Sequence, residues 1–393
     1  MKMIPSALLP ALCAAVLLLN PAPVRTAEVD EAALFARSLV SPGDTARIQR
    51  ALAKARRGET VTVGVIGGSI TQGAKATKPE LRYGDLVAAW WRKTFPKAKI
   101  LFVNAGIGAT GSNYGALRAK RDLLSQQPDF VIAEYAVNDG NTQACAETLE
   151  GLLRQILREP NQPGVVLLFT MNKAGGNAQE WHAKVGRHYG LPLVSFRDAF
   201  WPEIKEGRMK WEDVEADEVH PNDRGHEYCA RLVTQVLGQV LKDLPADDRL
   251  PPVKPLPAPL LNDLFERVAL FEADTLQPVS NQGWAFDAAR KCWKSEQPGS
   301  VAEFAVEGEV VLIMDFHVRK PMGKAKVQVD DLPPVVRDAW FDQTWGGYRQ
   351  TSELARGLKP GKHRVRIELL SEKNPQSDGH EFRLLALGAA GVR

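Results

Sequence analysis

Short apolar runs alternate with longer amphipathic segments in the first part of the chain. The apolar runs are rich in β-branched residues, as buried strands are, and the longer segments place apolar residues at helical spacing. The pattern predicts strands at 61–66, 100–104, 130–135, 165–170 and 191–195, and helices at 45–57, 81–94, 115–125, 148–158, 178–189 and 226–241. Because parallel strands need crossover connections, this order predicts an α/β domain whose parallel sheet is covered by helices on both faces.

The pattern changes after a proline-rich stretch that begins at Pro245. Beyond it, apolar and polar residues alternate with a period of two, and Gly, Pro, Asp and Asn separate the runs. Val365, Ile367 and Leu369 would share the buried face of an antiparallel strand. Strands are expected at 301–306, 310–318, 325–329, 363–370 and 381–387. We therefore predict an α/β domain at 28–244, a linker at 245–262 and a smaller all-β sandwich at 263–393.

Residues 1–27 have the pattern of a secretory signal peptide. Lys2 provides a charged start, and 7–19 form an uncharged apolar core that is too short to span a bilayer. Ala27 fits the last position before cleavage, although Arg25 is unusual two residues earlier. The alternative is an uncleaved membrane anchor. We predict an exported protein, periplasmic or extracellular, with no stable membrane insertion once the signal is removed.

Length and charge limit the classes of function. The 393 residues exceed the usual size of one domain, so two domains are expected. The net charge of +3 falls to +1 once Lys2 and Arg25 leave with the signal. This argues against a nucleic-acid-binding protein, because such proteins carry a basic surface. Cys145, Cys229 and Cys292 would remain, so at most one intramolecular disulfide can form.

A turn with two glycines follows the first predicted strand. Gly67 and Gly68 let the backbone bend sharply. Ser69 then lies at the carboxyl end of the strand, where open α/β sheets bind their ligands. A serine there is either a nucleophile or the N-cap of the next helix, and its position alone does not separate the two.

Other polar groups are expected at the same edge of the sheet. Backbone at 106–110 follows the second strand, Asn138 follows the third, and Asp217 and His220 precede the last helix. A histidine can take the proton of Ser69, while a carboxylate orients the imidazole and stabilises its charged form. Backbone N–H groups and the Asn138 amide can bind an oxyanion, each donor contributing roughly 3–4 kcal/mol. The set predicts acyl transfer to water.

Four blocks that contain these residues resemble the SGNH, or GDSL-like, hydrolase family. They are GGSIT at 67–71, NAGIGATGS at 104–112, AVND at 136–139 and DEVHPNDRGH at 217–226, in the order of the family. The resemblance implies a flavodoxin-like, three-layer fold with a five-stranded parallel sheet. It also implies the site residues: Ser69 as nucleophile, His220 as base, Asp217 as its orienting partner, and the N–H groups of Ser69 and Ala109 with the Asn138 amide as oxyanion hole.

Two positions depart from the family pattern. Ala109 stands at the glycine of the second block, unless the register shifts by one to Gly108, and Ala136 stands where the family often has glycine. The backbone N–H of residue 109 can still serve the oxyanion. Its methyl group takes up space beside the site, which favours a small acyl group such as acetyl.

Other interpretations of the same residues remain. Asp217 and His220 have the spacing of a surface salt bridge on a helix. Together with His226 they could hold a metal, but no motif such as H-E-x-x-H supports one, so we expect no metal and no cofactor. Three other polar residues are interpreted as structural or surface positions: Asp139, as a structural residue of its loop, and His182 and His188, on the surface of a helix.

The second domain contributes aromatic residues near predicted loops: Trp284, Trp293, Trp340, Trp345 and Tyr348. Core packing is the preferred interpretation for each one. Trp345 and Tyr348 flank two glycines and are the best candidates to stack on sugar rings, in keeping with a resemblance to two-domain carbohydrate esterases.

The sequence thus predicts a secreted serine esterase that removes acetyl groups from a polysaccharide or oligosaccharide. The acylated glycan is its expected partner. A lipase or lysophospholipase is the alternative within the same chemistry. A glycan-binding protein with a degenerate hydrolase domain is the alternative from another class.

Overall fold

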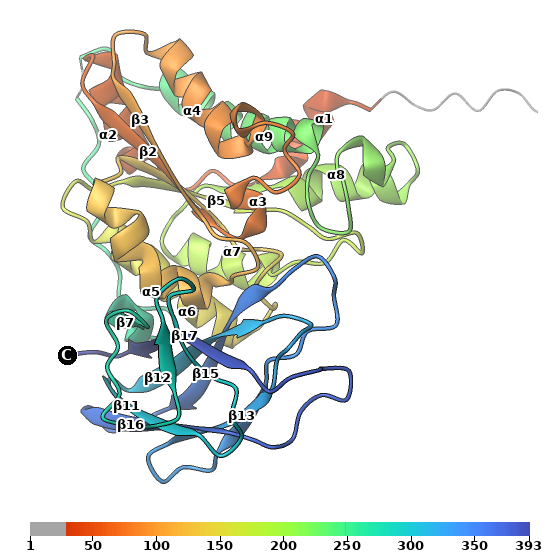
Figure 1. Ribbon diagram of the computed structural model, residues 1–393. Coiled ribbons are helices and arrows are strands. Elements are labelled where there is room, and N and C mark those ends of the chain that lie inside the picture. The colour runs from red at the N-terminus through yellow and green to blue at the C-terminus, as the bar shows by residue number, and fades with distance from the viewer. Residues whose placement is uncertain (1–28, 248) are drawn as a thin grey trace, which may run out of the picture.

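The computed structural model describes residues 29–247 and 249–393 (Figure 1). An α/β part, coloured red to green, lies above a β-rich part that is mostly blue. The predicted signal peptide, 1–27, lies outside the described residues. Within the described part of the chain, no helix combines the length and the apolar character needed to cross a membrane.

A six-stranded sheet forms the centre of the α/β part. Across it lie β1 (Leu39–Ser41), β6 (Leu193–Ser195), β5 (Gly164–Phe169), β4 (Phe130–Glu134), β2 (Val61–Gly67) and β3 (Ile100–Gly106). All neighbours run parallel except β1, which is antiparallel to β6. Every residue of β2 and β5 is buried, as expected of strands covered on both faces. The five predicted strands and the flavodoxin-like order are confirmed, and the short β1 is an addition.

Helices form the two outer layers. One apolar core contains α1 (Glu31–Ser38), α2 (Ala46–Arg56), α4 (Tyr83–Thr94), α8 (Phe196–Lys205) and α9 (Asp223–Lys242). The opposite core contains α5 (Ser112–Asp122), α6 (Gln143–Leu157) and α7 (Gln179–His188). The connections hold the short helices α3 (Ser69–Gln72), η1 (Pro79–Leu81), η2 (Leu124–Gln126), η3 (Trp211–Asp213) and η4 (Leu264–Glu266). The three-layer α/β prediction is therefore confirmed, with α1 and α8 beyond the predicted helices.

Two antiparallel sheets form the β-rich part. The first contains β15 (Tyr348–Arg356), β12 (Val310–His317), β17 (Phe382–Ala390), β10 (Cys292–Ser295) and β9 (Ala285–Asp287), with β7 (Val268–Glu272) also beside β17. The second contains β14 (Val335–Asp338), β13 (Lys324–Val329), β16 (Lys362–Leu369), β11 (Val301–Glu307) and β8 (Ser280–Gln282). Side chains of both sheets share one apolar core, in which Val365, Ile367 and Leu369 are buried as predicted.

One sheet of the sandwich packs against α5 and α6. Leu117 on α5 and Leu312 on β12 belong to a single apolar core that both parts share with Phe265. The fit is close, because a Cβ at Gly151 on α6 would come within 2.2 Å of the Phe265 side chain. A side chain at Gly388 would likewise meet Leu117 at 2.6 Å. The shared core fixes the sandwich relative to the central sheet.

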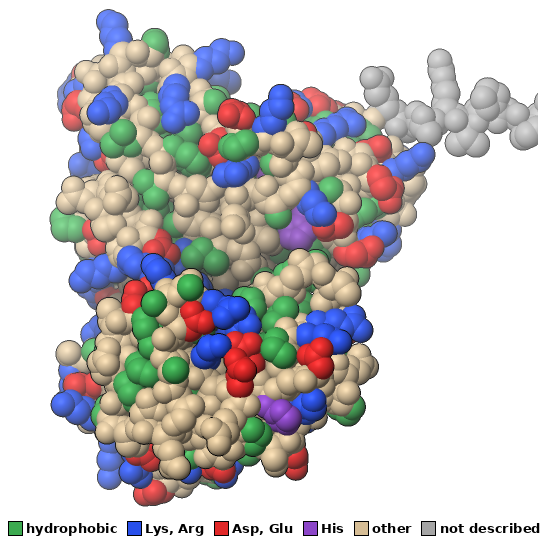
Figure 2. All heavy atoms as spheres, in the orientation of Figure 1, with side chains coloured by type: hydrophobic (Ala, Val, Ile, Leu, Met, Phe, Trp, Pro, Cys, Tyr) green, Lys and Arg blue, Asp and Glu red, His purple; other side chains and the backbone are tan. Residues whose placement is uncertain are grey.

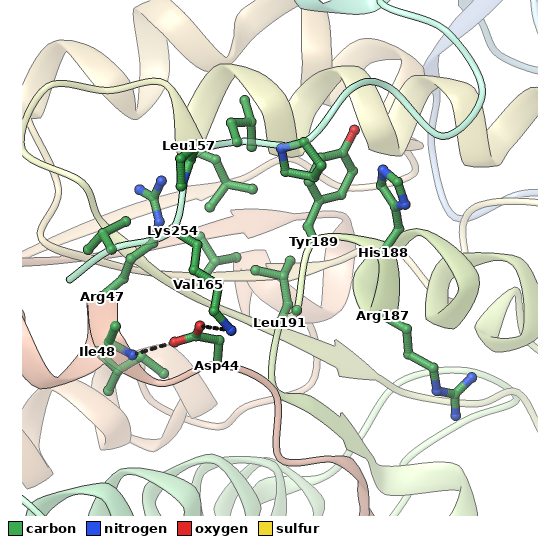
Figure 3. Close-up of a pocket in the computed structure, with 16 residues that line it drawn as sticks. Asp44, Arg47, Ile48, Leu157, Val165, Arg187, His188, Tyr189, Leu191 and Lys254 are labelled. Atoms are coloured by element: carbon green, nitrogen blue, oxygen red, sulfur yellow. Dashed lines mark hydrogen bonds and ion pairs between the residues drawn. The ribbon is translucent and has the colours of Figure 1, made fainter. Parts of the chain in front are cut away.

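The chain between the two parts lies against the α/β layer. Glu150 on α6 accepts hydrogen bonds from the N–H groups of Leu260 and Leu261 at 2.5 and 2.9 Å. Lys254 pairs with Asp44 at 2.9 Å beside a cavity of about 310 Å³, as the close-up in Figure 3 shows. Val165, near the amino end of β5, lines this cavity. The cavity is therefore at the edge of the sheet opposite to Ser69.

Candidate active site

Ser69 lies in a crowded turn at the carboxyl end of β2 and begins the single-turn helix α3. A Cβ at Gly67 would come within 2.3 Å of the Glu134 carbonyl oxygen on the neighbouring strand. A Cβ at Gly68 would come within 2.0 Å of Asn138 Oδ1. Two glycines are therefore needed so that the loop after β4 can approach Ser69.

His220 reaches the Ser69 hydroxyl from the turn before α9. Its Nε2 lies 2.9 Å from Ser69 Oγ, across 151 positions of sequence. Its Nδ1 lies 2.9 Å from both carboxylate oxygens of Asp217, which also accepts the backbone N–H groups of Val219 and His220. Because the carboxylate accepts from Nδ1–H, Nε2 is the nitrogen left to accept the serine proton. The structure thus joins three residues that the sequence predicted as a set.

The surroundings of Asp217 keep it ionised. Burial raises the pKa of this carboxyl, but the hydrogen bonds from the His220 ring and from two backbone N–H groups outweigh burial, so the pKa lies below its ordinary range. The Lys75 ammonium lies 3.6 Å from Asp217 Oδ2 and adds a favourable charge. An ionised carboxylate in this place can stabilise a protonated imidazole.

Three hydrogen-bond donors surround Ser69 without an acceptor of their own. Within residues 29–247 and 249–393, the N–H groups of Ser69 and Ala109 and the Asn138 side-chain amide donate to no protein group. Ala109 has a φ of +55°, a left-handed conformation that is costly for alanine. Such strain at a loop beside a reactive group is typical of functional sites. The described protein groups leave all three donors free, and Asn138 Oδ1, which faces Gly68, is buried without a hydrogen-bond partner.

Asp139 and His182 form a buried pair behind Asn138. Their side chains are 3% and 2% exposed, and His182 Nε2 lies 3.1 Å from Asp139 Oδ2. Asp139 Oδ1 accepts the N–H of Ser112 at 2.8 Å, in line with its predicted structural role. The prediction that His182 lies on the surface is wrong. It shares a buried helix face with Gln179, Ala183 and Gly186, and that spacing was the available signal.

Two buried glutamates near the site were not predicted. Burial raises the pKa of Glu134, at the end of β4, to about 7. Burial, with the nearby charge of Asp217, raises the pKa of Glu215 to about 9. Both oxygens of Glu215 lack a hydrogen-bond partner within the described residues. The charge states of Glu134 and Glu215 at neutral pH therefore differ from those of surface glutamates.

His226 bonds to backbone groups and not to Asp217 or His220. It is fully buried on α9, its Nε2 lies 3.1 Å from the Ala74 carbonyl, and its Nδ1 accepts the Tyr83 N–H at 3.4 Å. Burial lowers its pKa. In the part of the chain that the structure describes, no three His, Cys, Asp or Glu side chains are grouped to hold a metal ion.

A cavity of about 250 Å³ lies where the sandwich meets the loops behind the site. Ala109 and Asn138 line it from one side, and Gln350 and Thr351 of β15 line it from the other. The space-filling view in Figure 2 shows the surface hollowed between the two parts of the molecule. The sandwich therefore forms a wall close to the residues predicted to react.

The aromatic residues of the sandwich separate into two groups. Trp284 and Trp293 are buried in its core, as preferred from the sequence. Trp345 is 62% exposed, and its ring lies 6.0 Å from Tyr348 and 5.1 Å from Phe341. Phe341 was not predicted, because it lies outside the glycine turn that drew attention to the other two. These three rings form an aromatic cluster at the start of β15, in which Trp345 is exposed and Phe341 and Tyr348 are half-buried.

Comparisons with known proteins agree with this architecture. Residues 65–228 match the model of the GDSL-like lipase/acylhydrolase family. The crystal structure of a two-domain esterase (CEX) active on acetylated mannans is similar over 91% of this chain and 99% of its own, with 32% identity and a TM-score of 0.84. The same esterase co-crystallised with mannopentaose gives 32% identity, 91% and 98% coverage and a TM-score of 0.83. No curated protein sequence matches this chain.

The fold and these likenesses define a carboxylic ester hydrolase. The predicted α/β fold followed by a β-sandwich is confirmed over the length of a two-domain esterase. More particularly, the chain belongs to the GDSL-like, or SGNH, hydrolase family, as the four sequence blocks indicated.

Proposed function

We propose that this protein is a secreted serine esterase that removes small acyl groups, acetyl above all, from a polysaccharide or oligosaccharide. The observation that carries the proposal is the 2.9 Å approach of His220 Nε2 to Ser69 Oγ, with Asp217 on the other ring nitrogen. A serine hydroxyl is a weak nucleophile until a base accepts its proton, and this arrangement supplies the base.

The reaction begins when Ser69 Oγ attacks the ester carbonyl carbon and His220 Nε2 takes its proton. Asp217 stabilises the imidazolium that forms. The carbonyl oxygen gains negative charge and accepts hydrogen bonds from the Ser69 N–H, the Ala109 N–H and the Asn138 amide. The carbonyl re-forms, the bond to the sugar oxygen breaks, and His220 gives its proton to that oxygen. An acyl group remains on Ser69 and the deacylated glycan departs.

Water completes the cycle. His220 now takes a proton from a water molecule, whose oxygen attacks the acyl carbon. A second oxyanion forms in the same hole and collapses, the bond to Ser69 Oγ breaks, and His220 returns the proton to the serine. The products are a free carboxylic acid and the original enzyme.

The acetyl preference rests on Ala109. Its backbone is left-handed, with a φ of +55°, and its methyl group occupies space that glycine would leave open. A lipase would instead need a long apolar channel for its acyl chain. The cavity beside Ala109 is about 250 Å³ and includes the charged residues Glu353 and Arg356 among its lining. Arg356 pairs with Glu353 at 2.8 Å, so the lining includes an ion pair and is not a long apolar channel.

The glycan assignment rests on the two-domain relative and on the aromatic cluster at the start of β15. The relative is active on acetylated mannans, and this chain matches it along both domains. Trp345 and Tyr348 supply flat rings of the kind that stack on sugars. We place the hydrolase domain at 28–244, the linker at 245–262 and the sandwich at 263–393. Export is proposed from the signal-like pattern of 1–27.

The test compares wild type with Ser69→Ala on p-nitrophenyl acetate. The variant should lose hydrolysis while keeping its melting temperature and its glycan binding; equal rates would refute Ser69 as nucleophile. A series from acetyl to octanoyl esters separates the esterase from the lipase reading. Acetate release from acetylated mannan, compared with acetylated xylan, then identifies the glycan. Glycan binding with no hydrolysis of any ester would support the non-catalytic alternative.

A further inference from the structure

We propose that Asp139 and His182 are positioning residues that hold two oxyanion donors, the Ala109 N–H and the Asn138 amide, at a fixed separation. The inference rests on the proposed function of Ser69, Ala109 and Asn138. Neither Asp139 nor His182 touches the reacting atoms in this arrangement. They act through the loops that carry the donors.

The two loops have no sheet ladder between them. Ala109 follows β3 and Asn138 follows β4, and β2 lies between these strands. The loops therefore meet only above the end of β2, over Ser69. The hydrogen bond from the Ser112 N–H to Asp139 Oδ1, at 2.8 Å, joins them directly. It connects the residue next to Asn138 with the residue three positions beyond Ala109.

His182 fixes the other oxygen of the same carboxylate. Its Nε2–H donates to Asp139 Oδ2 at 3.1 Å from the buried face of α7. With one oxygen held by α5 and the other by α7, the carboxylate cannot rotate. Gly111 makes this possible, because a Cβ there would come within 2.6 Å of Asp139 Oδ1.

The loop does not depend on this pair for its path. The N–H groups of Asn138 and Asp139 donate to the Tyr135 carbonyl at 3.1 and 2.9 Å, and the Ala178 N–H donates to the Ala136 carbonyl at 2.8 Å. Loss of the side-chain pair should therefore leave the path of the loop unchanged but allow the Asn138 amide to shift by a small distance. Donors to an oxyanion are sensitive to such shifts, since a displacement near 1 Å can cost on the order of 100-fold in rate.

The experiment measures kcat and KM for p-nitrophenyl acetate and for its thionoacetate analogue, in which sulfur replaces the carbonyl oxygen. Sulfur accepts hydrogen bonds poorly, so the oxo-to-thiono rate ratio reports the oxyanion hole. Asp139→Ala and His182→Leu should lower kcat about 10- to 100-fold, with KM changed less than about threefold, and should lower the ratio. Asp139→Asn and His182→Gln should recover most of the rate, because they can restore the hydrogen bond.

Ser112→Pro and Ser112→Ala both lose the Ser112 hydroxyl, which bonds to Thr148 and the Cys145 carbonyl, so they differ in the backbone N–H, which the proline variant lacks. This pair tests the proposal without altering Asp139 or His182. Proline is favoured at the first position of a helix, and Gly111 before it is extended, so α5 should form. Its kcat should fall about 10-fold below that of Ser112→Ala, which retains the N–H. His188→Leu, on the same helix with its Nε2 bound to the Ala258 carbonyl, is the matched control and should equal wild type.

Folded variants with wild-type kcat and rate ratio would overturn the positioning role. So would equal losses on the oxo and thiono esters, since these would reflect a structural defect unrelated to the oxyanion. Ser69→Ala belongs in the same series. If this variant stays active, the proposed function is wrong, and the inference that rests on it is wrong as well. If it is inactive while Asp139→Ala and Ser112→Pro behave as wild type, only the inference fails.

Discussion

Gly68 and Asn138 are packed so closely that a Cβ on Gly68 would lie 2.0 Å from Asn138 Oδ1. The absence of a side chain at position 68 therefore decides where the Asn138 amide can lie. That amide is a proposed oxyanion donor. Gly68 therefore affects the proposed reaction in two ways: it forms the turn that carries Ser69, and it leaves room for the Asn138 amide.

Gly68→Ala should displace the Asn138 amide and remove one donor. The expected result is a loss in kcat of about 100- to 1,000-fold with a smaller change in KM. Steady-state kinetics on p-nitrophenyl acetate checks it, with circular dichroism to show that the fold persists. An active Gly68→Ala enzyme would mean that Asn138 does not serve the oxyanion.

Ala109→Gly should widen the acyl preference while keeping the N–H donor. Removing one methyl group from the acyl side should raise the butyryl-to-acetyl ratio of kcat/KM by about threefold to fivefold, the equivalent of about 0.8 kcal/mol. The left-handed φ of +55° costs alanine roughly 1 kcal/mol, and glycine at this position would avoid that cost. Glycine also has greater freedom in the unfolded chain, which lowers the free energy of unfolding and offsets this gain in stability. Stability should therefore change little. An unchanged ratio would place the acyl group elsewhere.

Glu215→Gln should stabilise the protein more strongly as the pH rises. Burial holds the pKa of Glu215 at about 9 in the folded state, against about 4.3 in an unfolded chain. Between these values the folded state binds the extra proton, so wild-type stability falls as pH rises, and glutamine, which does not titrate, escapes this loss. Urea unfolding at pH 5 and pH 8 measures both proteins. If the difference in the free energy of unfolding between the two proteins is the same at pH 5 and at pH 8, Glu215 is not buried in its protonated state.

Trp345→Ala should weaken binding of an acetylated oligosaccharide without affecting a small ester. Loss of one stacking ring, about 0.5–1.5 kcal/mol, predicts a KM raised about twofold to 12-fold for the oligosaccharide. The KM for p-nitrophenyl acetate should stay the same. Phe286→Ala is the matched control, since Phe286 is an exposed aromatic of β9, 38% accessible. Equal effects of the two variants would show that Trp345 has no special role.

The sequence predicted the central sheet well because β2 and β5 are apolar on both faces. It did not predict β1, whose three residues are too few to form a pattern. It also missed β15, which reads YRQTSELAR and carries polar residues on both faces. One reason is visible in the structure: Arg356 of β15 binds Glu147 of α6, so that strand contacts the other domain instead of a purely apolar core.

The site was predictable to the extent that its residues follow strand ends. Ser69 lies two residues beyond the end of β2 and Asn138 four residues beyond the end of β4, so local sequence located them. The Asp139–His182 pair joins positions 43 residues apart, and only tertiary packing brings them together. The burial of Glu215 could not be predicted either, because the acidic sequence around it gives no sign that this residue is 2% exposed in the folded chain.

The apolar core that contains Leu117, Phe265 and Leu312 has a consequence for how this enzyme can be re-engineered or can diverge. A chimera that exchanges the sandwich at the proline-rich junction would replace Phe265 and Leu312, which pack in that core with Leu117 of the α/β part. Recombination between relatives must therefore transfer the outer surface of α5 and α6 together with the sandwich. The sandwich and the outer surface of α5 and α6 must therefore be exchanged together, and this set of residues crosses the domain boundary predicted from the sequence.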